Sequence, residues 1–398
     1  MPAVVKFRKR QVSLCREGWF YLFLPAFVLT GALLREINLL VLLAGMLAGP
    51  LVLSWRLVIV ALRGLDLKRD LPRGACAGDL LVVDLELSNH RRRGSSWAVV
   101  VTDEIQRLTA TERPEPVPAS VVFARVGPGQ AVTAAYRGRL PRRGRYRFGP
   151  TKISTRFPLG LIRGTITADL VETVIIYPRL GRLERGWLDL HRDAVMGSRR
   201  TQRKHGLLEG EFHGLRDWRQ GDSRRWIHWR TSARRGNLTV RQFEQPRNQD
   251  LVLVVELWQP TRPTQAQRDA VELAVSFVAS VVVDACRRGG SHLSLAVGGQ
   301  GRQTVTGAAS VALQMEALET LAVAEAGAED RLPELLDAAY AEARQGVQMV
   351  VISTRAVDLT DSQRFSGLHR DSARARVVGW PLCIDCSSNE LDRYFRPE

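Results

Sequence analysis

The sequence is poor in the residues that build disulfide frameworks and metal centres, with five cysteines and seven histidines in 398 residues. An odd number of cysteines at wide spacing argues against a small secreted disulfide fold. The one close pair, Cys383 and Cys386, is a lone CxxC. A zinc site would need a second ligand pair, and a redox pair would need a thiolate of low pKa. We interpret both as reduced structural cysteines, with a redox or metal role as the alternative, and expect no cofactor.

Acidic residues are outnumbered by basic residues in the chain as a whole. There are 41 Asp and Glu against 57 Lys and Arg, which gives a net charge of +16. Such an excess indicates a face that attracts phosphate, anionic lipid or an acidic partner. The 45% hydrophobic and 25% charged residues exclude a disordered chain, and the length suits two or three domains.

Charge is absent from two apolar stretches near the N-terminus. Residues 18–34 and 37–54 carry none, and only Arg35 and Glu36 separate them. A membrane-spanning helix needs about 20 apolar residues, so the two stretches predict a transmembrane hairpin. A signal peptide is an alternative for the first stretch, although no small-residue cleavage site follows it. Two buried core helices of a soluble protein are the other alternative.

Basic residues flank this predicted hairpin on both sides. They are Lys6, Arg8, Lys9, Arg10 and Arg16 before it, and Arg56, Arg63, Lys68 and Arg69 after it. Positive charge stays on the cytoplasmic side of a membrane. The pattern therefore predicts a two-helix protein of the inner membrane, with both termini and the soluble domains in the cytoplasm.

The remaining chain predicts a multi-domain protein with two kinds of sheet. After a membrane hairpin with a basic N-terminal tail (1–64), alternation in short runs such as 81–87, 97–101 and 120–123 predicts a β-sandwich over 65–180. An arginine-rich segment follows at 181–250. Residues 251–398 then alternate between strands and helices, which is typical of a doubly wound α/β sheet.

The α/β pattern can be read element by element. The strands are predicted at 251–257, 293–297, 347–353 and 376–380, and the helices at 264–288, 308–324 and 332–345. The first strand is apolar at every position except Glu256, as expected of a parallel strand that is buried on both faces.

The most distinctive stretch is 210–234, GEFHGLRDWRQGDSRRWIHWRTSAR. Asp222 is placed to cap a short helix that starts at Ser223. On such a helix Trp226, Trp229 and Arg230 would share one face. Asp217 and Asp222 are expected to pair with arginines in a buried charge network, with Arg216, Arg225 and Arg234 as the candidates.

Three interpretations of this stretch compete. Residues 199–241 hold twelve Lys or Arg and four Asp or Glu, a net +8 that is half of the whole charge. Interleaved arginine and tryptophan can bind nucleic acid by stacking and phosphate contacts. Two aspartates and a histidine could be catalytic, but no nucleophile–base pair is recognisable. The third interpretation, which we favour, is an arginine–carboxylate–tryptophan cluster that stabilises the segment and presents a surface to a partner.

With Leu238, Val240, Phe243 and the apolar strand that follows, this stretch resembles the domain-of-unknown-function 58 family (DUF58). Residues 143–146, residues 157–161 and the apolar hairpin are also similar to that family, so the resemblance covers nearly the whole chain. It implies a von Willebrand factor A-like α/β domain after the motif. It also implies association with a MoxR-type AAA+ ATPase in a chaperone-like system.

A von Willebrand factor A-like domain often binds a divalent ion through D-x-S-x-S at the end of its first strand. Here the corresponding residues are Glu256, Trp258 and Pro260. An indole and a proline ring replace the hydroxyls that would coordinate a hard cation. We therefore predict a degenerate site without a metal.

The sequence as a whole predicts a membrane-anchored scaffold or assembly factor that binds protein partners and is not an enzyme. The alternative is a membrane-proximal binder of nucleic acid or anionic lipid that uses residues 199–241. The residues predicted to form the binding or structural motif are Arg216, Asp217, Gly221, Asp222, Arg225, His228, Trp229 and Arg234.

Overall fold

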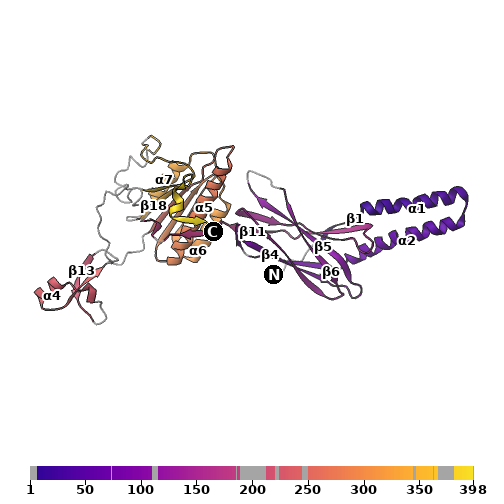
Figure 1. Cartoon of the computed structure of the whole chain (residues 1–398), viewed down its shortest axis with the longest axis horizontal. Helices are drawn as coiled ribbons and strands as arrows, with labels where there is room; N and C mark the ends of the chain where they lie inside the picture. Colours follow the sequence, from indigo (N-terminus) through magenta and orange to yellow (C-terminus); the bar gives the residue numbers. More distant parts are fainter. Residues whose placement is uncertain are drawn as a thin grey trace. The chain divides into compact units, whose positions relative to one another are not determined.

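The computed structural model divides the chain into two compact units, Met1–Pro178 and Arg179–Glu398 (Figure 1). The residues that it describes are 7–72, 74–109, 115–184, 186–188, 212–219, 224–243, 250–343, 347–361, 363–365 and 381–397. Gly221, Asp222 and the strand predicted at 376–380 lie outside these residues. Each unit has a hydrophobic core of its own.

Two long helices follow the first strand of unit 1. They are α1 (Arg16–Arg35) and α2 (Asn38–Ala61), and Glu36 turns the chain between them in a left-handed conformation with φ 54°. Both are long and apolar enough to cross a membrane, and only 17% of each apolar stretch is buried. A core helix of a soluble protein would be mostly buried, so this exposure favours the predicted hairpin.

The rest of unit 1 consists of two sheets. Its strands are β1 (Phe7–Leu14), β2 (Leu65–Asp70), β3 (Ala75–Cys76), β4 (Leu80–Asn89), β5 (Ser96–Leu108), β6 (Val117–Val126), β7 (Ala131–Arg139), β8 (Gly144–Phe148), β9 (Thr151–Thr155), β10 (Ile162–Ala168) and β11 (Glu172–Tyr177). One sheet has the order β1-β10-β9-β5-β8-β11-β3 with β6 on β5, and the other has the order β2-β4-β7. Alternate side chains of both sheets, such as Leu67, Leu87 and Val101, meet in one core.

Strand β1 differs from the basic tail that we predicted for these residues. It pairs antiparallel with β10 along its length. Its charged residues hide the apolar–polar alternation that marks a strand in a sequence. The strand forms nevertheless, because an edge strand is held mainly by its backbone hydrogen bonds.

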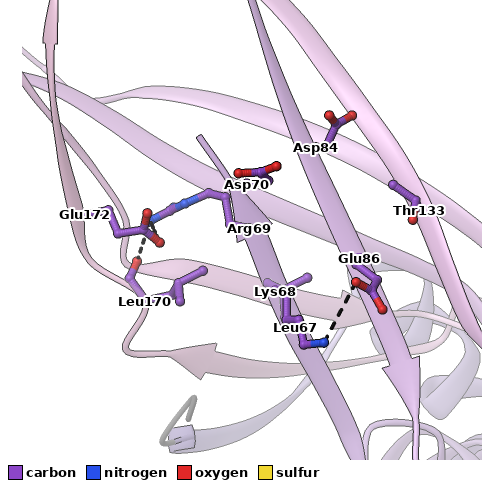
Figure 2. A pocket seen from close by; sticks show the side chains of 9 residues that line it. All are labelled: Leu67, Lys68, Arg69, Asp70, Asp84, Glu86, Thr133, Leu170 and Glu172. Atoms are coloured by element: carbon purple, nitrogen blue, oxygen red, sulfur yellow. Dashed lines mark hydrogen bonds and ion pairs between the residues drawn. The ribbon is translucent and has the colours of Figure 1, made fainter. Parts of the chain in front are cut away.

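A buried ion pair joins the two sheets. The side chains of Arg69 on β2 and Asp103 on β5 are fully buried, with 3.1 Å between Nη1 and Oδ1. Tyr136 on β7 donates a hydrogen bond to the second oxygen of Asp103 at 2.9 Å, and burial together with this carboxylate raises the pKa of Tyr136. Arg69 also donates to Glu172 at 3.3 Å (Figure 2). This network fixes the position of one sheet against the other.

A surface pocket of about 520 Å³ lies beside Arg69 (Figure 2). Its lining carries both signs of charge, and Lys68 and Glu86 face each other across it at 4.0 Å. The acidic residues of the lining outnumber the basic ones, with Asp70, Asp84, Glu86 and Glu172 against Lys68 and Arg69.

Unit 2 is built on a five-stranded sheet of order β17-β16-β15-β18-β19. The strands are β15 (Leu251–Glu256), β16 (His292–Gly298), β17 (Arg302–Ala308), β18 (Gln348–Ser353) and β19 (Leu382–Asp385). All neighbours are parallel except β17, which lies antiparallel at the edge and was not predicted. A short strand β12 (Gly181–Leu183) pairs with β20 (Phe395–Pro397), and a 3-10 turn η2 (Asn389–Arg393) precedes β20.

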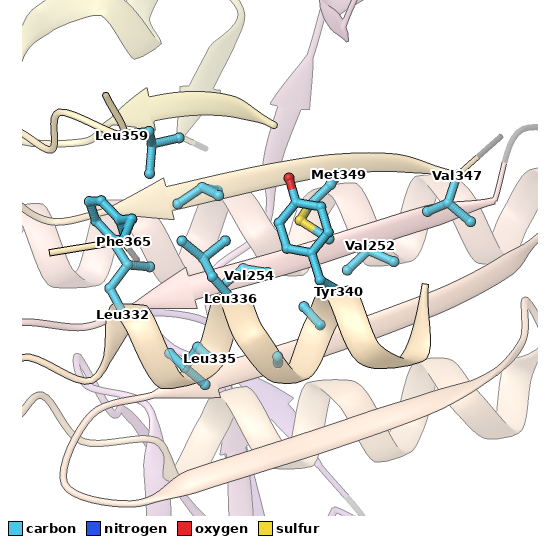
Figure 3. Packing of buried hydrophobic residues seen from close by; sticks show 13 residues of the cluster. Val252, Val254, Leu332, Leu335, Leu336, Tyr340, Val347, Met349, Leu359 and Phe365 are labelled. Atoms are coloured by element: carbon cyan, nitrogen blue, oxygen red, sulfur yellow. The ribbon is translucent and has the colours of Figure 1, made fainter. Parts of the chain in front are cut away.

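Helices cover both faces of this sheet. They are α5 (Gln265–Arg288), α6 (Val311–Val323) and α7 (Leu332–Glu342). Helix α7 packs Leu335, Leu336 and Tyr340 on Val252 and Val254 of β15 (Figure 3). The intervening residues of β15 point to the opposite face, where α5 lies. Helix α5 begins in the capping box that Thr264 and Gln267 form.

Candidate functional site

The arginine-rich motif folds into a small module of described residues 212–219 and 224–243. Strands β13 (Phe212–Asp217) and β14 (Thr239–Phe243) pair antiparallel, and Trp218 N–H donates to the carbonyl of Leu238 at 2.8 Å. Ile227 forms a bridge to Val240, and both are buried. These contacts hold the 3-10 turn η1 (Arg224–Trp226) and helix α4 (Trp229–Arg235) against the hairpin.

The helix that we predicted from Ser223 does not form as one piece. It is interrupted at Ile227 and resumes at α4, whose N-cap is His228. The His228 Nδ1 atom accepts a hydrogen bond from the backbone N–H of Thr231 at 3.3 Å. The reason for the interruption is tertiary: His228 N–H donates to the carbonyl of Thr239 at 2.8 Å and is lost to the helix.

Ser232 stabilises the other side of α4. Its hydroxyl donates to the carbonyl of His228 and accepts from the N–H of Thr239 at 2.9 Å. The helix ends at Gly236, whose φ of 75° favours glycine.

Two tryptophans lie on the surface of the module. The exposed fractions are 43% for Trp226 and 66% for Trp229, and Leu215 and Leu238 are also exposed. Arg224, Arg230, Arg234 and Arg235 are exposed on the same short elements. The module thus combines large apolar rings with positive charge on a hydrogen-bonded frame.

The buried charge network that we predicted does not include Asp217 or Arg234, because both side chains are exposed. A module this small has too little apolar volume to repay the desolvation of an ion pair. Arg216 is half-buried and donates to the carbonyl of Asp217 at 3.2 Å. The side chain of Arg225 lies outside the described residues, as do Gly221 and Asp222.

A second candidate site lies at the carboxyl edge of the five-stranded sheet. The chain moves from β15 to β16 on one side and later to β18 on the other, so the strand order reverses between β15 and β18. Ligands of open α/β sheets bind in the crevice at such a switch point. The residues that meet there are Glu256 at the end of β15, Ser353 at the end of β18, and Thr354 and Arg355 after it.

Side chains of this chain fill the crevice. Glu256 is 2% exposed and accepts hydrogen bonds from the Ser353 hydroxyl at 2.6 Å and from Arg355 Nη2 at 2.5 Å. The same Nη2 donates to Asp330 at 2.7 Å, and Arg364 donates to both oxygens of Asp330. The Arg355 guanidinium also lies 4.9 Å from the centre of the Trp258 ring.

This arrangement does not fit a divalent cation. The guanidinium of Arg355 lies between the carboxylates of Glu256 and Asp330, and together with the guanidinium of Arg364 it already balances their charge. Trp258 turns its indole N–H to the carbonyl of Ala328, and its backbone binds Thr354. Within the described residues, no group of three or more His, Cys, Asp or Glu side chains is placed to hold a metal. Burial favours a raised pKa for Asp330, but the hydrogen bond from Arg364 and the charges of Arg355 and Arg364 outweigh it and lower that pKa.

The CxxC pair lies in and after β19. Cys386 is 3% exposed, and its N–H donates to the carbonyl of Ser353. Burial, with a smaller effect of Asp385, raises the pKa of Cys383 to about 11, and burial raises that of Cys386 as well. A redox pair needs the opposite shift, so the geometry favours our structural interpretation.

Sequence reasoning missed Arg355, Asp330 and Arg364. Thr354 and Arg355 directly follow the predicted strand 347–353, and that position was a usable signal for Arg355. Asp330 and Arg364 carry no local signal, because they meet only in the folded chain.

Comparison with known proteins relates part of this geometry to a family. Residues 214–379 match the family model described as Protein of unknown function DUF58. The predicted DUF58 resemblance is confirmed over this stretch. The DUF58 region begins in β13 and ends before β19. It includes most of the α/β sheet and, from residue 214 onward, the small module that carries Trp226 and Trp229, here called the Arg–Trp module.

A curated relative, Uncharacterized protein YeaD of Bacillus subtilis (strain 168), is 29% identical over 162 residues. The match covers 40% of this chain and 38% of that protein. The solved structures that match part of this chain include a β-glucosidase from Listeria innocua. Its identity is 19% and its TM-score 0.20, over 28% of this chain and 16% of that chain. A CARDB domain from Pyrococcus furiosus has 9% identity and a TM-score of 0.18 over 28% and 94%. These scores are too low to relate the folds.

Proposed function

We propose that this protein is a non-catalytic membrane-anchored scaffold that presents a cytoplasmic von Willebrand factor A-like domain to a protein partner. The parallel sheet with helices on both faces supports the domain type. The crevice at its switch point supports a non-catalytic role, because Arg355 and Trp258 occupy the position where a ligand or metal would bind. The apolar helices and their basic flanks support a membrane anchor with the soluble parts on the cytoplasmic side.

The observation that carries the proposal is the exposure of Trp226 and Trp229 beside arginines. Tryptophan and arginine are the residues most enriched at the energetic centres of protein interfaces. The backbone around them is held by Ser232 and His228, so binding would require little ordering. The positive charge selects an acidic partner surface.

A MoxR-type AAA+ ATPase is the partner we propose. The confirmed DUF58 region supports it, because that resemblance implies such a partner.

The test is a mild-detergent pulldown of the tagged full-length protein, with and without nuclease, read by mass spectrometry. We expect an AAA+ ATPase that survives nuclease. The double variant Trp226→Ala/Trp229→Ala should reduce its recovery about tenfold or more, the loss expected for a central interface tryptophan. Val311→Ala, which removes an exposed side chain on α6, is the matched control and should leave recovery unchanged.

The alternative function is binding of nucleic acid by the same module. Exposed tryptophans beside arginines favour it, since bases stack on aromatic rings. Recovery of only nuclease-sensitive material, lost in the tryptophan variant and steeply salt-dependent, would replace the scaffold proposal with this one.

A further inference from the structure

Both ends of the helical hairpin are bonded to the same end of the β-sandwich. Cys15 N–H, just before α1, donates to the carbonyl of Leu161 at 2.9 Å. The last carbonyls of α2 are capped by side chains, with Ser96 Oγ 2.7 Å from the oxygen of Ala61 and Arg91 Nη1 3.0 Å from that of Val60. This end of the sandwich therefore adjoins the apolar helices without a linker.

Two glycines allow a close approach at this junction. A Cβ on Gly18 of α1 would lie 2.1 Å from the carbonyl oxygen of Leu161. A Cβ on Gly164 of β10 would lie 2.4 Å from the side chain of Val58, which is fully buried in α2. The hairpin and the sandwich end are thus one packed structure, and the level of the membrane on the helices also sets its level on the sandwich.

Two exposed tryptophans mark that level. Tryptophan is enriched at membrane–water interfaces. Trp19 on α1 is 64% exposed and directly follows Gly18, and Trp55 on α2 is 45% exposed. Trp55 lies three residues, about 4.5 Å along the helix, before Val58. The membrane–water interface marked by these rings therefore lies at the level of the sandwich end.

This end of the sandwich carries its own exposed apolar side chains. Trp97 is 40% exposed, Phe157 37% and Leu159 53%. The rings of Trp97 and Phe157 stack with centroids 6.0 Å apart. Trp97 directly follows Ser96, and Leu159 lies two residues before Leu161, so all three are close to the helix ends.

Positive charge surrounds these apolar side chains. Arg125 places its guanidinium 5.0 Å from the centre of the Trp97 ring. The exposed basic residues at this end are Arg16, Arg63, Arg92, Arg93, Arg125 and Arg156, whereas the acidic residues on the same segments are Glu17 and Asp66. Arginines around exposed aromatic rings match the anionic headgroups of a bilayer.

We propose that Trp97, Phe157, Leu159 and Arg125 form a lipid-contact surface that enters the headgroup region of an anionic membrane. This inference rests on the membrane anchor of the proposed function and adds that the sandwich itself binds lipid. Burial of its apolar side chains at the interface, together with the arginine contacts, would hold the sandwich at one orientation to the bilayer.

The test is photo-crosslinking of the full-length protein in vesicles of phosphatidylcholine and phosphatidylglycerol. The photoreactive residue p-benzoyl-phenylalanine replaces Phe157 or, in a second variant, Leu159. It replaces Phe27 of α1 as the control for membrane insertion. It replaces Val117 as the matched control, because Val117 is 65% exposed at the other end of β6, nine residues or about 30 Å from Val126. Lipid adducts are quantified by mass spectrometry.

We expect severalfold more lipid adduct at Phe157 and Leu159 than at Val117, with adduct also at Phe27. Adduct at Phe27 alone would overturn the lipid-contact surface and leave the membrane anchor standing. No adduct at any position would overturn the anchor itself. Crosslinks from Phe157 into a protein instead of lipid would assign this surface to a protein interface and overturn the inference.

The charged part of the surface is tested separately. In the Phe157 crosslinking variant, Arg125→Gln/Arg156→Gln should lower lipid adduct severalfold in vesicles that contain phosphatidylglycerol. In pure phosphatidylcholine the same double variant should have little effect, because neutral headgroups do not reward the guanidinium charge. An equal effect in both kinds of vesicle would overturn the assignment to anionic lipid.

Discussion

At the scale of single residues, each unit of the protein contains an ion pair whose carboxylate is buried. Arg69 and Asp103 are both fully buried and belong to different sheets of the sandwich. In the α/β unit the buried carboxylate of Glu256 pairs with Arg355, whose side chain is only partly buried. Arg355 joins segments that are 99 and 25 residues away in the sequence. Neither pair belongs to the Arg–Trp module, in which Asp217 and Arg234 are exposed.

Removing one partner of the sandwich pair should be costly. Asp103→Ala leaves the guanidinium of Arg69 buried and without its nearest carboxylate, and we expect a loss of about 3–5 kcal/mol in the free energy of unfolding. Chemical denaturation in detergent measures it. The surface pair Lys152–Glu104 offers a control, since Lys152→Gln should cost about 1 kcal/mol or less. An equal loss in both variants would show that burial of the pair is unimportant.

At the scale of elements, the ion pairs in the crevice join three segments of the chain. These are the end of β15, the segment that follows β18 and the loop before α7. The pKa of Asp330 is lowered in the folded state, so its contribution to stability is complete above the pKa of the unfolded chain and is lost as the pH falls through the folded value. The ion pairs of Asp330 with Arg355 and Arg364 should therefore break in acid, below about pH 4.

The variant Asp330→Asn tests this pH dependence. It should be less stable than the wild type at pH 7, and the difference in unfolding free energy should narrow as the pH falls below about 4. Glu316→Gln, which changes an exposed carboxylate on α6, is the control and should show no such trend. A difference that stays constant across the pH range would mean that Asp330 acts through shape and not through charge.

At the scale of the whole molecule, the chain has two compact units with separate cores. Calorimetry of the full-length protein in detergent should show two unfolding transitions. Asp103→Ala should shift one of them. Leu336→Ala, at a side chain that is 1% exposed, should shift the other by removing about 2–5 kcal/mol of packing. A single transition that both variants shift equally would show that the units unfold together.

Much of the molecule could be predicted from the sequence because the signals are local. Uncharged runs of about 20 residues predict apolar helices in any context. Residues 251–255 and 349–352 are continuously apolar, as strands covered on both faces must be, and α5 carries its own capping box at Thr264 and Gln267. The DUF58 resemblance also follows from sequence, since it depends on one long and specific motif.

The tertiary structure alone decided the rest, because the partners are distant along the chain. The bridge from Ile227 to Val240 divides the short helix that the sequence predicts from Ser223. Strand β1 is too charged to show alternation and exists because β10 supplies its hydrogen bonds. The residues around Glu256 predict a poor ion site from sequence alone. Only the fold brings Arg355 and Asp330 to Glu256 and fills that site with a guanidinium. Local patterns determine which elements form, whereas the desolvation of charges and the pairing of remote strands determine what those elements do together.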